Sequence, residues 1–271
     1  MTRELDLFYK LTNIKGLKSY KIKSGITNIN YKIKTDIGEF VIRIPRKDII
    51  GLNRKNEEKV ISVVKAIKLN VDIIYFDSNT GIMISKYVKT KKRKHVSLKV
   101  INEHLKKLHS LSVLDIEEFN PFKLIDTYSK YCDEKTFINK EIIINQSQNL
   151  YKKYPLVLCH NDLLYANCIN SNDKEYLIDY EYAGKNIALF DIASFISENN
   201  IENLTSIKRL LKMYYGKVSD EMIKDINTMC LLLDMLWAYW GYAMYNIYNQ
   251  KIFLDIAISK HQRFNSKSCI Y

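Results

Sequence analysis

Three stretches of alternating apolar and polar residues near the N-terminus place the strongest constraint on the fold of this chain. They cover residues 20–22, 29–33 and 40–44, and only short turns at 24–25 and 36–38 separate them. Such alternation is typical of strands that bury one face. Because connections this short join antiparallel neighbours, the sequence predicts a three-stranded antiparallel meander.

The rest of the chain separates into a short mixed part and a long helical part. Residues 53–69 have helical spacing, and two further strand candidates follow at 71–76 and 82–88. From Leu98 the pattern is mostly helical, apart from a strand-rich island at 156–180. We therefore predict an α+β, two-lobe fold. A small N-terminal lobe (1–88) combines an antiparallel sheet with one helix, and a larger, mainly helical C-terminal lobe covers 89–271.

Composition excludes several classes of protein. Hydrophobic residues make up 47% of the 271 residues, which argues against disorder of the whole chain. The five cysteines, Cys269 among them, form no C-x-x-C pair, so neither a disulfide framework nor a cysteine zinc site is expected. The most apolar run, 230–245, is interrupted by Asp234 and is shorter than the roughly 20 residues of a membrane helix. We expect a cytoplasmic protein without membrane insertion.

The formal net charge of +12 suggests an anionic partner, but the charge is unevenly distributed. Residues 86–107 hold nine Lys and Arg against one Glu, whereas residues 151–200 hold four Lys against seven Asp and Glu. The densest basic run, 89–95, is either a phosphate-contacting patch or a solvated loop between lobes. A basic nucleic-acid-binding module is a remote alternative function, and we expect no nucleic-acid partner.

The strand-rich island carries the strongest chemical signal. His160, Asp162 and Asn167 lie in one polar loop, and Asp179 follows on the next strand. The gap between Asp162 and Asn167 matches the catalytic loop of protein kinases, H-R-D-x-x-x-x-N. Asp162 is suited to accept the proton of an attacking hydroxyl and to contact the substrate, while Asn167 and Asp179 offer the oxygen ligands that Mg²⁺ prefers. We expect His160 to brace the loop; an Asx-rich turn without chemistry is the alternative.

A kinase needs a nucleotide site, and the N-terminal lobe offers candidates. Gly25 permits a tight turn in the first hairpin, where Thr27 and Asn28 can add donors to backbone N–H groups around phosphates. No G-x-G-x-x-G motif is present there. Lys86, Tyr87 and Val88 lie at the lobe boundary, where the backbone of a hinge would bind adenine.

Arg43, on the third predicted strand, stands where kinases place a lysine that binds the α- and β-phosphates. A guanidinium is well suited to bidentate phosphate contact. Glu57, on the following helix, is its expected acidic partner. A surface cation at the edge of a strand is the alternative interpretation of Arg43.

Together these motifs resemble one known family over residues 15–265. The motifs are Gly25-x-Thr27-Asn28, Asn53-Arg-Lys-Asn-Glu57, His160-Asn-Asp162-x4-Asn167, Ile178-Asp179-Tyr-Glu181-Tyr182 and Phe190-Asp191-Ile. They are similar to those of the choline/ethanolamine kinases, particularly the compact bacterial choline kinases. The resemblance implies an aminoglycoside-phosphotransferase-like, protein-kinase-like fold that uses ATP and Mg²⁺. We expect Asp191 to brace the catalytic loop rather than to bind a ligand.

The only two tryptophans, Trp237 and Trp240, are three residues apart on one predicted helix. An aromatic core stripe is the ordinary interpretation, but ring faces also hold quaternary ammonium groups, which cannot donate N–H hydrogen bonds. The resemblance implies that this pair lines a substrate pocket with Glu181, Tyr182 and Glu198. The chain departs from the eukaryotic relatives at Leu164, where those carry Gln.

The sequence thus predicts an ATP-dependent choline kinase, a transferase that phosphorylates the choline hydroxyl to give phosphocholine. A kinase of another amino alcohol or of an aminoglycoside is the alternative within enzymes. The expected partner is a small-molecule substrate, and the expected assembly is a monomer or homodimer.

Overall fold

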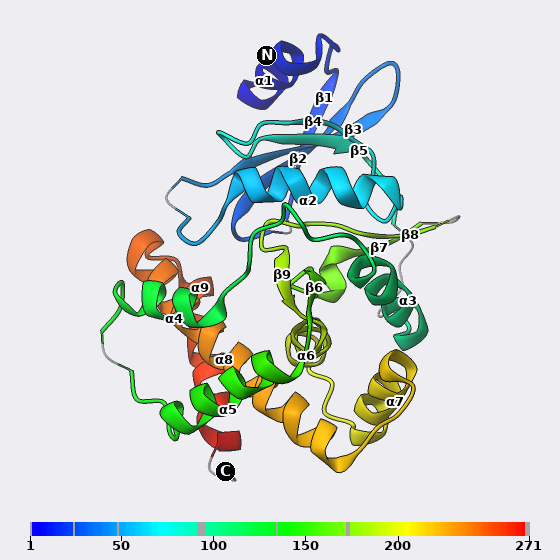
Figure 1. The fold of residues 1–271 in the computed structure, drawn as a ribbon. Helices are drawn as coiled ribbons and strands as arrows, with labels where there is room; N and C mark the ends of the chain where they lie inside the picture. Colours follow the sequence, from blue (N-terminus) through cyan, green and yellow to red (C-terminus); the bar gives the residue numbers. More distant parts are fainter. Residues whose placement is uncertain are drawn as a thin grey trace. The chain divides into compact units, whose positions relative to one another are not determined.

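The computed structural model describes residues 2–23, 25–47, 49–90, 96–133, 135–171 and 174–268 (Figure 1). Ser24, residues 91–95 of the basic run and Cys269 therefore lie outside the described residues. The chain divides into two compact units. Unit one comprises Met1–Val96 and Ala166–Glu181, and unit two comprises Ser97–Tyr165 and Tyr182–Tyr271. The lobe boundary at residues 88/89 stays a prediction, and the two units are taken in turn.

Unit one contains an antiparallel five-stranded sheet in the order β1-β2-β3-β5-β4. Its strands are β1 (Lys18–Ile22), β2 (Asn28–Lys34), β3 (Glu39–Pro45), β4 (Ile73–Phe76) and β5 (Met83–Lys86). The predicted meander is confirmed as β1-β2-β3. The three central strands β2, β3 and β5 each contribute one fully enclosed isoleucine to the core, namely Ile33, Ile42 and Ile84.

Two helices accompany this sheet, one more than the sequence analysis predicts. α2 (Arg54–Ala66) is the predicted helix, and the Asn53 side chain caps it by accepting from the Asn56 N–H. The added helix is α1 (Arg3–Thr12), whose Leu5 and Phe8 pack with the sheet core. The Phe8 and Phe40 rings lie 5.5 Å apart between centroids. Unit one also contains a small hairpin of β7 (Cys168–Asn170) and β8 (Glu175–Leu177), preceded by the 3₁₀ turn η1 (Tyr165–Asn167).

Unit two is mainly helical, as predicted. Its helices are α3 (Leu98–His109), α4 (Pro121–Ser129), α5 (Lys140–Lys153), α6 (Ala188–Glu198), α7 (Leu204–Tyr215), α8 (Asp220–Tyr248) and α9 (Lys251–Ser268). Ser97, Asn120, Asn203 and Ser219 cap four of these helices by side-chain hydrogen bonds. A short antiparallel pair, β6 (Leu156–Cys159) and β9 (Gly184–Ile187), frames the predicted catalytic loop.

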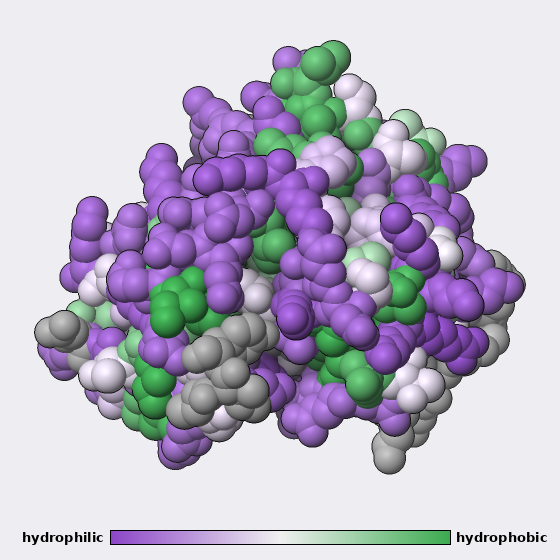
Figure 2. Space-filling model, turned by 60° about the horizontal axis from the view of Figure 1, so that its bottom comes forward, coloured by the Kyte–Doolittle hydropathy of each residue, from purple (hydrophilic) through white to green (hydrophobic). Residues whose placement is uncertain are grey.

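α8 is the longest helix, and most of its second half is buried. None of the helices within the described residues combines the length and apolar character needed to cross a membrane. Figure 2 shows one face of the molecule, on which hydrophilic side chains predominate and hydrophobic areas are small and separated.

Gly241 determines how closely α9 approaches α8. A Cβ at this position would lie 2.9 Å from the Phe253 carbonyl oxygen and 3.0 Å from the Ala257 Cβ. These distances are too short for a Cβ atom. Because Gly241 has no side chain, the backbones of the two helices can pack directly against each other.

We therefore expect Gly241→Ala to lower the free energy of unfolding by about 1 kcal/mol. Alanine favours a helix by about 1 kcal/mol over glycine, but overpacking costs about 1–3 kcal/mol. Urea denaturation measures the change, with Asn227→Ala at an exposed position of the same helix as control. A Gly241→Ala variant that is more stable than the parent would contradict this account of the crossing.

Candidate active site

The predicted Arg43–Glu57 ion pair is present in unit one. Arg43 Nη1 lies 2.6 Å from Glu57 Oε1, and Nη2 donates to the Gly81 carbonyl at 3.1 Å. Both side chains are almost fully buried. Burial alone would lower the pKa of Arg43, but Glu57 and the neighbouring carboxylates raise it, so the guanidinium remains charged. Its role towards a nucleotide stays a prediction.

Arg54 is a second cation at this place, partly buried, which the sequence analysis does not select. Its Nη1 lies 2.7 Å from Glu57 Oε2 and 3.1 Å from Glu181 Oε2, so that it bridges two carboxylates. The signal was available, because Arg54 and Glu57 are three residues apart and therefore share a helix face. Arg54 thereby links α2 to the segment that carries Glu181.

Glu181 also anchors the first hairpin. Its Oε1 accepts from the Thr27 hydroxyl at 2.8 Å, and its Oε2 accepts from Asn28 Nδ2 at 3.0 Å. Burial alone would raise the pKa of Glu181, but Arg43, Arg54 and these two donors hold it below its usual range. The side-chain donors of Thr27 and Asn28 are thus directed at a carboxylate of the same unit.

Gly25 begins this anchored segment with φ +95°, a conformation that favours glycine. The hairpin can therefore turn tightly between β1 and β2, as the sequence predicts. Its backbone N–H groups are then the part of this loop best suited to phosphate contact.

The two predicted metal ligands lie on neighbouring segments of unit one. The Ile178 N–H donates to the Asn167 carbonyl at 2.9 Å. This hydrogen bond places Asn167 next to the residue that directly precedes Asp179. Asp179 has φ +70°, a strained conformation for a non-glycine residue that is often found at functional sites. Among the described residues no hydrogen-bond donor reaches its buried Oδ1, and Arg43 Nη1 is 3.6 Å away.

The electrostatic surroundings of the Asp179 carboxylate favour the binding of a cation. Burial and, after it, the neighbouring Glu181 raise the pKa of Asp179 to about 7, against the opposing effect of Arg43. A carboxylate oxygen without a donor, together with an asparagine amide, is a hard-oxygen set of the kind Mg²⁺ binds. The residues present therefore fit a magnesium site.

A cavity of about 410 Å³ in unit one has Arg43, Glu57 and Asp179 in its wall, together with residues 86–88. The Tyr87 N–H donates to the Glu39 carbonyl at 2.9 Å, and the Lys86 N–H donates to the Asp72 carbonyl at 2.8 Å. The Lys32 ammonium lies 3.8 Å from the centroid of the Tyr87 ring. The size and the cationic wall of this cavity suit a nucleotide.

In unit two, the predicted catalytic loop follows β6 and is held by Asp191. The His160 N–H donates to Asp191 Oδ2 at 2.8 Å, and the Asn161 N–H donates to Oδ1 at 2.7 Å. The Asp162 N–H donates to His160 Nδ1 at 3.3 Å. Asn161 has φ +67°, and its amide group bonds to the Tyr182 carbonyl and to Asn186. Asp191 and His160 therefore brace the loop, as predicted.

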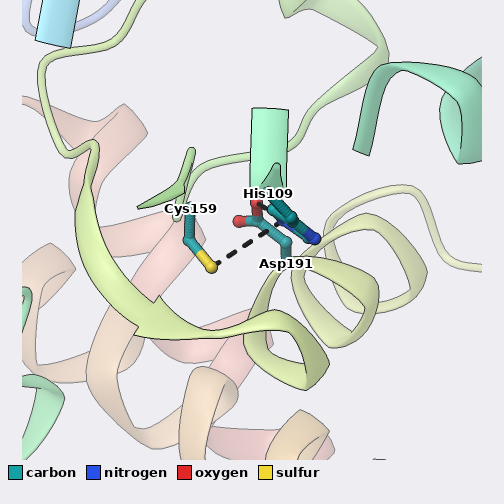
Figure 3. A group of neighbouring side chains, drawn as sticks. All are labelled: His109, Cys159 and Asp191. Carbon is teal, nitrogen blue, oxygen red and sulfur yellow. Dashed lines mark hydrogen bonds and ion pairs between the residues drawn. The ribbon is translucent and has the colours of Figure 1, made fainter. Parts of the chain in front are cut away.

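His109 supports this brace from α3, and sequence reasoning did not select it. Figure 3 shows His109, Cys159 and Asp191 gathered around one point, with all three side chains buried. His109 Nε2 lies 3.0 Å from Asp191 Oδ2, and Nδ1 lies 2.6 Å from the Tyr214 hydroxyl. A histidine inside the apolar stripe of a predicted helix was the available signal.

The same three side chains have the composition of a metal site or a nucleophile relay, but their contacts indicate neither. Cys159 Sγ lies 3.8 Å from His109 Nε2, the nitrogen that also faces Asp191, so the imidazole cannot relay a proton between them. Burial and Asp191 raise the pKa of the Cys159 thiol well above its usual value. Since both oxygens of Asp191 accept backbone N–H groups, the cluster serves the loop.

The two tryptophans lie in an aromatic cluster of unit two, and their role in a substrate pocket stays a prediction. The ring centroids of Tyr182 and Trp237 are 5.1 Å apart, those of Trp237 and Trp240 are 6.0 Å apart, and both contacts are edge-to-face. Phe253 of α9, which the sequence analysis does not select, continues the cluster from Trp240 at 5.5 Å. Within the part of the chain that the structure describes, neither buried indole N–H has an acceptor.

Glu198, predicted to line the substrate pocket, already faces a cation of the protein. The Lys260 ammonium of α9 donates to Glu198 Oε1 at the C-terminal end of α6. Lys260 Nζ also lies 3.9 Å from Asp234 Oδ1. The structure therefore places Glu198 in an internal ion pair.

We expect Asp191→Asn to loosen the catalytic loop. An asparagine side chain offers one acceptor oxygen for two backbone N–H groups, and each hydrogen bond to a charged group contributes about 1.5–3 kcal/mol. Amide hydrogen exchange at His160 and Asn161 should accelerate, and the free energy of unfolding should fall by about 2 kcal/mol. Asp126→Asn, at an exposed position of α4, is the matched control. Unchanged exchange at both amides would refute the brace.

Comparisons with known proteins identify the family of this chain. The family model described as choline/ethanolamine kinase matches residues 20–267. Protein LicA of Haemophilus influenzae is 28% identical over 241 residues, covering 80% of this chain and 70% of LicA. The solved choline kinase LicA of Streptococcus pneumoniae is 24% identical, and the alignment covers all of both chains with a TM-score of 0.81.

A more distant solved structure shares the fold. A spectinomycin phosphotransferase in complex with ADP and spectinomycin is 14% identical, with a TM-score of 0.62 over 96% of this chain and 98% of that chain. The predicted protein-kinase-like, aminoglycoside-phosphotransferase-like fold is thus confirmed. Because the family model matches nearly the whole chain, this protein belongs to the choline/ethanolamine kinase family.

Proposed function

We propose that this protein is an ATP-dependent choline kinase that transfers the γ-phosphoryl group to the choline hydroxyl and yields phosphocholine. Its family identifies it as a phosphotransferase with an alcohol acceptor. The observation that carries the choice of choline is the cluster of Tyr182, Trp237 and Trp240 in the same unit as Asp162.

The chemistry of the cluster favours a methylated cation. A trimethylammonium group has no N–H to donate and is held by ring faces, with contacts of roughly 0.5–2 kcal/mol each. A primary ammonium, as in ethanolamine, instead requires several acceptors. The obvious carboxylate acceptor in unit two, Glu198, is engaged by Lys260. An aminoglycoside would in addition require a broad acidic cleft.

Unit one supplies the groups suited to bind a nucleotide. ATP with Mg²⁺, when bound, provides the phosphoryl group and neutralises the charge on its oxygens. We assign phosphate contact to Arg43, held by Glu57, and to the backbone of the hairpin around Gly25. Asn167 and Asp179 are suited to hold Mg²⁺. We assign adenine recognition to the backbone of residues 86–88, where the Lys86 and Tyr87 N–H groups already donate to the Asp72 and Glu39 carbonyls, so that the N–H contact falls to Val88.

Unit two supplies the groups that act on the alcohol. Asp162 orients the substrate hydroxyl and accepts its proton, and its loop position is set by Asp191 through the backbone of His160 and Asn161. Rigid positioning of this carboxylate is the main contribution the protein can make, because phosphoryl transfer depends chiefly on alignment and charge.

Three further parts of the sequence interpretation belong to this proposal. We keep a cytoplasmic location, a monomeric or homodimeric assembly and the division into lobes at 1–88 and 89–271. The alternative of a nucleic-acid-binding module depended on residues 89–94, of which 91–94 lie outside the described residues. That alternative gives no reason for the donor-free oxygen of Asp179.

The substrate is tested by ADP release from purified protein with ATP and Mg²⁺. We expect choline to support at least tenfold higher kcat/KM than ethanolamine, and kanamycin to support none, because only choline matches an aromatic cluster without a free carboxylate. Omission of the acceptor is the control. Equal or better turnover with ethanolamine would overturn the assignment of choline, and no turnover with any acceptor would overturn the function.

The base is tested by Asp162→Asn. We expect turnover to fall by about 10²–10⁴-fold, the usual contribution of general base catalysis, with nucleotide affinity nearly unchanged because Asp162 lies in unit two. Single-turnover kinetics and ADP titration measure the two effects separately. Asp115→Asn in the same unit serves as control. A variant with normal kcat would refute Asp162 as the base.

A further inference from the structure

A lysine lies on the buried face of α9. Phe253, Ala257, Lys260 and Phe264 recur at spacings of three and four, and the three apolar members are fully enclosed. Lys260 itself is 9% exposed. A lysine is rarely buried without a partner, because desolvation of its charge is costly.

Two carboxylates from two other helices provide that partner. Glu198, the last residue of α6, accepts a hydrogen bond from Lys260, and Asp234 of α8 lies 3.9 Å from the same ammonium. Asp234 is shared with Arg263, whose Nε donates to its Oδ2 at 2.7 Å. Since Asp234 has a guanidinium of its own, Lys260 is the cation that serves Glu198.

This ion pair shares two helices, α8 and α9, with the aromatic cluster. Trp237 follows Asp234 by three residues on α8, which is less than one helical turn. Asp234 Oδ1 accepts from the hydroxyl of Ser197, the residue that precedes Glu198. On α9, Phe253 contacts Trp240 and lies seven residues before Lys260 on the same face.

We infer that Lys260 is a specificity-determining residue for the acceptor alcohol: it gives Glu198 an internal counter-ion and so excludes this carboxylate from binding the ammonium of the substrate. Ring faces then hold the cation alone, which suits a quaternary ammonium and penalises a primary one. This inference rests on the proposed function, because it concerns the choice between acceptors of the same reaction.

Lys260→Met tests the inference directly, because it keeps the length of the side chain and removes the charge. Glu198 is then left without its cation, and a primary ammonium can replace it. We expect the ratio of kcat/KM for ethanolamine to kcat/KM for choline to rise about tenfold. Lys251→Met, an exposed lysine of the same helix paired with Asp255, is the matched control and should leave the ratio unchanged. An unchanged ratio in Lys260→Met would overturn the inference.

The double variant Glu198→Gln/Lys260→Met separates specificity from structure. It removes both charges together, a change that buried ion pairs often tolerate. We expect the gain for ethanolamine to disappear in this variant. A gain that persists would overturn the inference, because Glu198 could not then be its source.

A binding measurement keeps the test independent of turnover. Ethylammonium should raise the Tm of Lys260→Met by several degrees more than that of the parent, whereas tetramethylammonium should not discriminate between them. Equal ethylammonium shifts would overturn the inference. If the parent protein released no ADP with either acceptor, the proposed function would fail, and the Tm comparison would still decide the role of Lys260.

Discussion

Four charged groups of unit one, three of them buried and Arg54 partly buried, depend on one another. Arg43 pairs with Glu57, Glu57 also pairs with Arg54, and Arg54 pairs with Glu181. A buried charge is tolerable only with partners, and removal of one member leaves the next uncompensated. Because these residues come from β3, α2 and the segment after β8, the chain of charges ties the sheet, the helix and the hairpin residues Thr27 and Asn28 into one arrangement.

The balance of this network explains the state of Asp179. Counted with Asp179, the group holds three carboxylates and two guanidinium groups, a net charge of −1. The surplus negative charge, added to burial, raises the pKa of Asp179 to about 7, whereas the pKa of Glu181, which has cations and donors at both oxygens, is lowered. A bound cation would offset this surplus negative charge, which fits the magnesium site that we propose at Asp179.

Patterns in the sequence were sufficient to predict most helices and strands and to recognise the motifs by their spacing. They did not predict which charged side chains pair with each other. Alternation predicted β1–β3, and the position of Glu57 after Arg43 predicted their ion pair. α1 was missed because its apolar residues, among them Leu5 and Phe8, alternate with charged ones and find their partners only in the sheet core. Arg54 was passed over beside Glu57, although both share a helix face.

Glu198 shows the limit most clearly. Its offset from Asp191 and the resemblance pointed to the substrate, whereas the structure gives it Lys260 from a helix 62 residues away in sequence. Such long-range pairing depends on how α6, α8 and α9 pack, which no local pattern contains. Lys260 interrupts an otherwise apolar periodicity with Phe253, Ala257 and Phe264, and a charged residue on a buried face was the one available sign.

These contacts distinguish carboxylates whose oxygens are hydrogen-bonded within the protein from a carboxylate that keeps an oxygen without a donor. Glu57, Glu181, Asp191 and Glu198 each accept hydrogen bonds from a cation, a side chain or the backbone of the same unit. Asp179 retains an oxygen that no donor among the described residues reaches. The sequence motifs show only that Asp179, Glu181 and Asp191 are acidic, and they do not distinguish the roles of the three residues. Their partners separate them: Glu181 and Asp191 accept hydrogen bonds from the protein, whereas Asp179 keeps the donor-free oxygen on which our proposal of a metal ligand rests.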